Sequence, residues 1–152
     1  SRIVGNYAFS VGRGYVIAID TGVVPEETPG TVVGPDVAYC LDANTFDDAE
    51  PKWGETPPVL AVEVLSPNDR TSEVNEKVAD SIRAGVRVVW LADPGLKTVT
   101  VYRKDHHHSV LKAGDDLTGG GDLPGCSCPV ADFFHLPGDP PRAPQSPPPA
   151  AP

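Results

Sequence analysis

The fold is decided by residues 59–70, which read VLAVEVLSPNDR. The first seven residues are apolar except for Glu63, and such a continuous run is typical of a strand buried on both faces. Ser66-Pro67-Asn68-Asp69 then gives a turn and a helix-entry signal. We therefore expect a buried strand that leads directly into a helix.

The elements downstream of this stretch are a helix and then a series of strands. The helix is expected from about Ser72 to Ala84, ending at Gly85, which suits the residue just after a helix. Three strands are expected after it, over residues 87–92, 98–102 and 108–112. A short helical turn near residues 130–134 closes the domain.

Upstream, residues 3–11 carry apolar side chains at four-residue steps, which predicts a short helix. Strands are expected over residues 15–19 and 36–41, and a polar loop over residues 42–58. This order of elements predicts an α/β (α+β) fold, with a mixed β-sheet and a crossover helix on one face.

The chain has 152 residues, and its 12 Lys and Arg against 21 Asp and Glu give a net charge of -9. A protein this acidic does not bind polyanions non-specifically, so a nucleic-acid role requires a local basic surface or bridging metal ions. No apolar run is long enough to span a membrane. Three cysteines suit a reducing compartment, so we expect a cytoplasmic protein.

The end of the chain differs in composition from the rest. Residues 137–152 read PGDPPRAPQSPPPAAP, and proline removes backbone donors and restricts φ. We therefore expect a folded domain over residues 1–136 and a Pro-rich disordered tail over residues 137–152.

Glu63 and Asp36 are the candidate metal ligands. Burying the Glu63 carboxylate among apolar neighbours is costly unless a cation holds it, although a strand end that reaches solvent would also explain a lone Glu. Asp36 follows Pro35 at the start of another strand, where the alternative is an ordinary turn residue. If the two strands are neighbours, two carboxylates, a backbone carbonyl and waters make a site for Mg²⁺.

Lys77 is the third candidate. It lies at the edge of the apolar face of the predicted helix, where it would ordinarily pair with Glu73 four residues earlier. Because the helix follows the Glu63 strand directly, Lys77 could instead deliver an ammonium group to the carboxylates. There it would orient a water molecule and stabilise charge developing on a phosphoryl oxygen.

Several stretches together resemble a known family. They are GPDVAYC at residues 34–40, AVEVLSPNDR at 61–70, EKVADSIRAGVRVVWLADP at 76–94 and DDLTGGGDLPGCSCPVADFF at 115–134. The sequence resembles the Uma-type restriction endonucleases, which belong to the PD-(D/E)XK nuclease superfamily. The resemblance implies a restriction-endonuclease-like mixed sheet flanked by helices and a magnesium-dependent endonuclease that hydrolyses phosphodiester bonds, with DNA as partner.

The resemblance also assigns roles to single residues. Asp36 corresponds to the first metal-binding acid, Glu63 to the second, and Val64 would lend its backbone carbonyl to Mg²⁺ or Mn²⁺. The usual superfamily lysine position is Leu65 here, and Lys77 on the following helix matches the lysine of this family. The family also has an N-terminal segment with an acidic residue, and we expect this sequence, which begins at Ser1, to lack it.

The sequence is also compatible with other functions. A chain without the N-terminal segment could be a catalytically silent nuclease fold that acts as an interaction or dimerisation module, and a homodimer is compatible with either function. Asp20-Thr21-Gly22 after an apolar run matches the catalytic loop of retroviral-type aspartic proteases, although Asp20 also suits a turn.

Two further groups of residues are candidates for binding. Cys40, Cys126 and Cys128 with His106–His108 could suggest zinc, but the spacing favours structural thiols and a surface loop. A local phosphate-binding surface, or ordinary surface charge, is expected from Arg70, Arg83, Arg87, Arg103 and Lys104.

Overall fold

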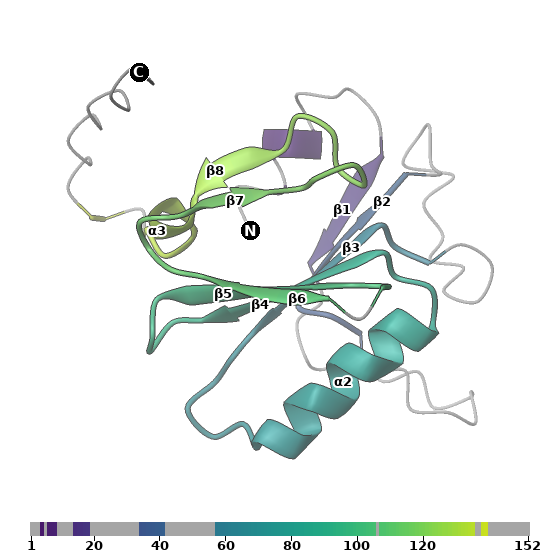
Figure 1. Ribbon diagram of the computed structural model, residues 1–152, viewed down its shortest axis with the longest axis horizontal. Helices are drawn as coiled ribbons and strands as arrows, with labels where there is room; N and C mark the ends of the chain where they lie inside the picture. Colours follow the sequence, from purple (N-terminus) through teal and green to yellow (C-terminus); the bar gives the residue numbers. More distant parts are fainter. Residues whose placement is uncertain are drawn as a thin grey trace.

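The computed structural model is built around one six-stranded sheet (Figure 1). The structure describes residues 4, 6–8, 14–18, 34–41, 57–105, 107–135 and 138–139. The strands are β1 (Tyr15–Ala18), β2 (Val37–Cys40), β3 (Leu60–Val64), β4 (Val88–Asp93), β5 (Thr98–Arg103) and β6 (His108–Leu111). They lie side by side in chain order, and all neighbours are antiparallel except β3 and β4. The mixed sheet predicted from the sequence is therefore confirmed.

The parallel pair of β3 and β4 requires a crossover, which the helix α2 (Thr71–Arg83) supplies. The chain returns to the sheet at Gly85, which has a φ of +100°, and a Cβ at that position would lie 2.8 Å from the Pro57 side chain. Both observations favour glycine there. The predicted helix end at Gly85 is confirmed.

The alternation of side chains divides the sheet into two buried faces. The α2 face carries a small cluster of Ala61, Val78, Val86 and Val89. The opposite face carries the larger core, where Trp90, Tyr39 and Leu60 are almost fully buried. A central strand with apolar residues on both sides explains why residues 59–65 read as one continuous apolar run.

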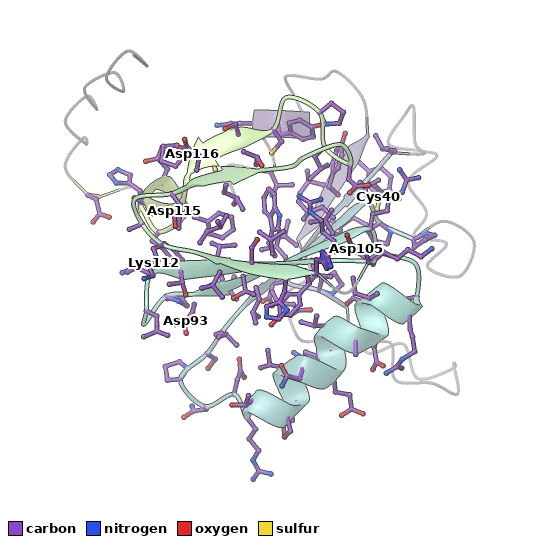
Figure 2. The ribbon with its side chains drawn as sticks, viewed as in Figure 1. Cys40, Asp93, Asp105, Lys112, Asp115 and Asp116 are labelled. Atoms are coloured by element: carbon purple, nitrogen blue, oxygen red, sulfur yellow. The ribbon has the colours of Figure 1, made fainter. Side chains whose placement is uncertain are left out.

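A hairpin that the sequence did not predict covers the larger core. It consists of β7 (Asp116–Thr118) and β8 (Ser127–Pro129), followed by the expected helical turn α3 (Val130–Phe133). Side chains from this hairpin and from the sheet fill the space between the two layers (Figure 2). The buried contributions from this layer are Leu117, Leu123, Cys126 and Val130.

The two ends of the chain are described only in part. Val4 and residues 6–8 are helical, as the predicted short helix requires, and Val4 is buried in the larger core. The predicted polar loop lies outside the described residues except for residues 57–58, and the predicted tail lies outside them except for residues 138–139. Among the described helices, none is long and apolar enough to cross a membrane.

Candidate metal centre

Strand pairing brings Asp36 and Glu63 together. Val37 of β2 pairs with Val62 of β3, and the two strands are antiparallel. Asp36 precedes Val37 and Glu63 follows Val62, so these two residues lie opposite each other and on the same side of the sheet. The Oδ2 atom of Asp36 accepts a hydrogen bond from the Val64 backbone N–H at 2.7 Å. This bond fixes the Asp36 carboxylate at the sheet end, immediately after Pro35.

Glu63 is buried and forms no ion pair with any charged residue that the structure describes. Its residue is 6% exposed, and it is the one buried polar or charged residue in the part of the chain that the structure describes. The pKa of Glu63 is raised from 4.5 to about 7, mainly because the carboxyl group is buried and also because the charge of Asp36 lies nearby. Lys77 opposes these effects and lowers the pKa, whereas Asp69 adds to the increase. The interior position predicted for Glu63 is confirmed.

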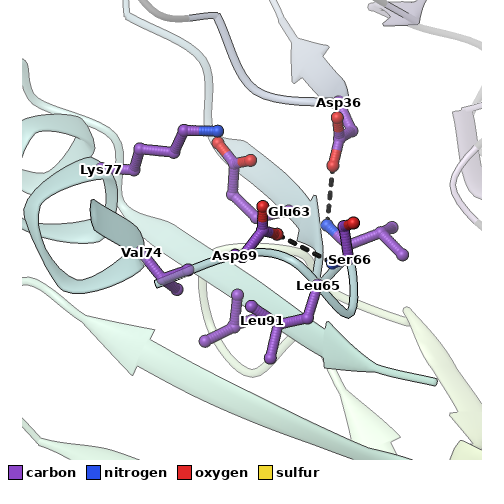
Figure 3. Close-up of a pocket in the computed structure, with 9 residues that line it drawn as sticks. Asp36, Glu63, Leu65, Ser66, Asp69, Val74, Lys77 and Leu91 are labelled. Atoms are coloured by element: carbon purple, nitrogen blue, oxygen red, sulfur yellow. Dashed lines mark hydrogen bonds between the residues drawn. The ribbon is translucent and has the colours of Figure 1, made fainter. Parts of the chain in front are cut away.

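The Lys77 side chain points from α2 toward the Glu63 carboxylate (Figure 3). The residue is half-buried, and within the described residues it forms no ion pair with Glu73 or Glu63. Lys77 lies three residues after Val74, so the two side chains share a face of α2, and both line the same pocket. The ordinary surface pair with Glu73 is therefore wrong, and the ammonium group faces the carboxylates.

Asp69 is a site residue that the sequence analysis did not single out. Its Oδ2 atom accepts a hydrogen bond from the Ser66 N–H at 2.7 Å, and its own N–H donates to the Ser66 carbonyl at 3.0 Å. These bonds hold the turn between β3 and α2 and keep the Asp69 carboxylate at the site. The Ser-x-x-Asp spacing in front of the helix was the available signal.

Together these groups line a pocket of about 180 Å³. Its charged members are Asp36, Glu63, Asp69 and Lys77, and Val74 and Leu91 are among its apolar members. Three carboxylates surround one ammonium, so the pocket has an excess of hard oxygen donors.

This donor set suits Mg²⁺ or Mn²⁺, which bind through one or two carboxylates and keep several waters. No group of three or more His, Cys, Asp or Glu in the described ranges is arranged to hold a metal ion by itself. A cation here would therefore rely on Asp36 and Glu63, with water or the Val64 carbonyl completing its shell. The buried, unpaired carboxylate of Glu63 fits this arrangement.

The predicted phosphate-binding cations do not gather at this site. Arg70 immediately precedes α2 at the site end of the helix, whereas Arg83 lies at the other end and pairs with Asp80. Arg103 lies opposite Val88, at the far end of β4, and binds Asp122 at 3.1 Å. Arg87 and Lys104 flank that same far end.

The residues of the alternative sites are described only in part. Asp20, Thr21, Gly22 and His106 lie outside the described residues. Cys126 and Cys128 are free thiols. Burial raises the pKa of Cys126 and raises that of Cys128 to about 11, so the metal-binding thiolate form is disfavoured.

The fold of this chain is similar to that of a solved structure. It is described as a "putative nuclease belonging to DUF820" from Anabaena variabilis ATCC 29413. The two structures align with a TM-score of 0.62 and 17% sequence identity, over 88% of this chain and 74% of the other. Among proteins with curated functions, none matches this sequence.

The sequence itself matches a family profile over residues 1–131, and that family is described as "Uma2: Putative restriction endonuclease". The match includes Asp36, Glu63, Val64 and Lys77 and covers most of the chain. The chain therefore belongs to the Uma2 family.

Proposed function

We propose that the protein is a metal-dependent endonuclease that hydrolyses phosphodiester bonds of nucleic acids, with DNA as its substrate. Membership of the Uma2 family supports a nuclease function. The observation that carries the proposal is the convergence of Asp36, Glu63 and Lys77 on one pocket around a buried carboxylate. A structural role alone does not explain why Glu63 is kept where burial opposes its charge.

In this proposal Asp36 and Glu63 hold Mg²⁺ or Mn²⁺, with the Val64 backbone carbonyl as a further ligand. A bound divalent ion polarises a phosphoryl oxygen and lowers the pKa of a coordinated water. The Lys77 ammonium donates to the attacking water or to the phosphoryl oxygen, and stabilises negative charge that develops there. The hydrogen bond from Val64 keeps Asp36 oriented before substrate arrives.

A plasmid-nicking assay tests the proposal. The chain should convert supercoiled DNA to the open-circular form with Mg²⁺ or Mn²⁺, and EDTA should abolish the reaction. Glu63→Gln keeps the size of the side chain but removes its charge, and it should eliminate nicking. Asp80→Asn, on the exposed side of α2, is the matched control and should nick like the parent chain.

A parent chain that cuts neither DNA nor RNA with either metal would overturn the proposal. That result would favour a catalytically silent member of the fold that acts as an interaction or dimerisation module. Cutting that Glu63→Gln leaves unchanged would place any activity outside this pocket.

A further inference from the structure

A second pocket, of about 520 Å³, adjoins the candidate metal centre. The residues that line both pockets are Leu65, Ser66, Asp69, Val74 and Leu91. It lies between the first turns of α2 and the turn that joins β4 to β5. Because the two pockets share lining residues, the second pocket is the neighbouring space for a molecule bound at the metal centre.

The wall of the second pocket is mostly apolar and includes one aromatic ring. Leu91 and Tyr102 line it from the sheet, and Pro94 lines it from the β4–β5 turn. The Tyr102 ring stacks on the His108 ring, with centroids 5.6 Å apart and an interplanar angle of 25°. This contact restrains the tyrosine ring, and the part of the ring that lines the pocket offers a platform for another planar group.

The polar groups of the second pocket are acceptors and amides rather than cations. Asp93, labelled in Figure 2, accepts hydrogen bonds from the Gly95 and Leu96 N–H groups through Oδ1, at 2.8 and 2.9 Å. Asn75 and Thr71 of α2 add exposed side chains that donate and accept. No Lys or Arg is among the lining residues that the structure describes. A phosphate is therefore disfavoured here, whereas a neutral planar ring with amino groups matches both the wall and the acceptors.

We infer that this second pocket binds the nucleobase of the nucleotide next to the phosphate that is cut. The inference rests on the proposed function, because the scissile phosphate defines the neighbouring position. The volume lies within the range of small-molecule sites, and the apolar wall with few polar groups is typical of pockets that read an unstacked base. The pocket would thus provide a contact to a nucleobase. The arginines do not provide one, because they do not gather at this site.

Nucleoside binding tests the inference without requiring catalysis. The probes are 2′-deoxyadenosine, thymidine, deoxycytidine and deoxyguanosine, which carry no phosphate, titrated into the metal-free full chain by NMR. At least one should bind weakly. Tyr102→Leu and Asn75→Trp should each weaken binding about tenfold or more, because the first removes the platform and the second fills the space. Glu76→Ala, on the exposed side of α2, should bind like the parent chain.

Asn75→Trp alters an exposed helix position, so it keeps the test valid if Tyr102→Leu fails to fold. No nucleoside binding by the parent chain, or equal binding by a folded Asn75→Trp variant, would overturn the inference. A parent chain that binds nucleosides in this pocket but never cuts nucleic acid would overturn the proposed function and leave a nucleobase site.

A substrate with one missing base gives the second readout. In a single-stranded oligonucleotide with one abasic nucleotide, cutting at the adjacent phosphate should fall roughly tenfold relative to the intact strand. Matched deoxyribose and ribose strands distinguish DNA from RNA as the source of the base. Unchanged cutting beside the abasic nucleotide would contradict the inference while leaving the nuclease proposal intact.

Discussion

Glu63 and Asp122 are two carboxylates in very different surroundings. Asp122 lies between β7 and β8, its side chain is 35% exposed, and it binds Arg103 at 3.1 Å. Glu63 lies near the end of β3, is 6% exposed, and has Asp36 and Asp69 as nearby charges with Lys77 pointing toward it. Solvent and the Arg103 cation stabilise the charge of Asp122, whereas the buried Glu63 needs a further cation or a proton to offset its charge. The difference separates a surface ion pair from a site prepared for a ligand.

The largest difference between the two carboxylates is expected in catalysis. Glu63→Gln should reduce plasmid nicking by more than about 100-fold, because a metal centre supplies several kcal/mol of charge stabilisation. Asp122→Asn should change the nicking rate by less than about twofold. Initial rates at saturating Mg²⁺ measure both variants, and an equal loss in the two would break the comparison.

The two cations associated with these carboxylates should differ in the same way. Lys77→Ala should lower nicking about 100-fold, because it removes a donor aimed at developing charge in a desolvated pocket. Arg103→Ala, which removes the partner of Asp122, should leave the nicking rate nearly unchanged. A Lys77→Ala variant that nicks like the parent chain would remove Lys77 from the mechanism.

The raised pKa of Glu63 predicts how the stability of the metal-free protein depends on pH. Its folded pKa of about 7 exceeds the ordinary 4.5, so the folded state retains the proton longer than the unfolded state. The contribution of Glu63 to the free energy of unfolding should therefore fall as the pH rises from about 4.5 to about 7, and then level off. The change in the pKa of Glu63 corresponds to a loss of about 3 kcal/mol in the free energy of unfolding over this pH range.

Urea unfolding of the parent chain and of Glu63→Gln, at several pH values in EDTA, measures this effect. The difference between the two curves isolates Glu63, and the variant should gain relative stability as the pH rises. A difference that does not change with pH would show that Glu63 is ordinarily solvated.

The smallest expected effect is the loss of the Arg103–Asp122 ion pair. Asp122→Asn should lower the free energy of unfolding by at most about 1 kcal/mol, because the pair is partly exposed and screened by water. Added salt should reduce the cost further. Urea unfolding at low and high salt checks this, and a cost that salt does not change would indicate a stronger, less hydrated pair.

Much of the fold could be predicted because the local sequence patterns favour the same strands and helix that pack together in the structure. The apolar run around Glu63 predicts β3, and the helix end at Gly85 agrees with the end of α2. The strands expected over residues 87–92 and 98–102 correspond to β4 and β5. The β7–β8 hairpin was missed because its strands are three residues long and interrupted by a Gly-rich stretch. Strands that short carry no detectable alternation.

The site was predicted less completely, because its geometry depends on strand register and on a turn. The residue types at Asp36, Glu63 and Lys77 suggested their roles, but only the pairing of β2 with β3 sets the two carboxylates opposite each other. The Ser-x-x-Asp spacing indicates that Asp69 holds the turn into α2, but it does not indicate that the Asp69 carboxylate also lines the pocket. The second pocket lies between α2 and the β4–β5 turn. These two segments are too far apart in the sequence for a local pattern to show that they meet.

The most direct test of the central claim is calorimetric titration of Mg²⁺ into the parent chain, Glu63→Gln and Asp122→Asn at pH 8 and pH 6. We predict binding by the parent chain and by Asp122→Asn that is tighter at pH 8, because the cation requires the Glu63 carboxylate without its proton. We predict no binding by Glu63→Gln. Equal binding by all three chains, or no binding by the parent chain at pH 8, would contradict the account.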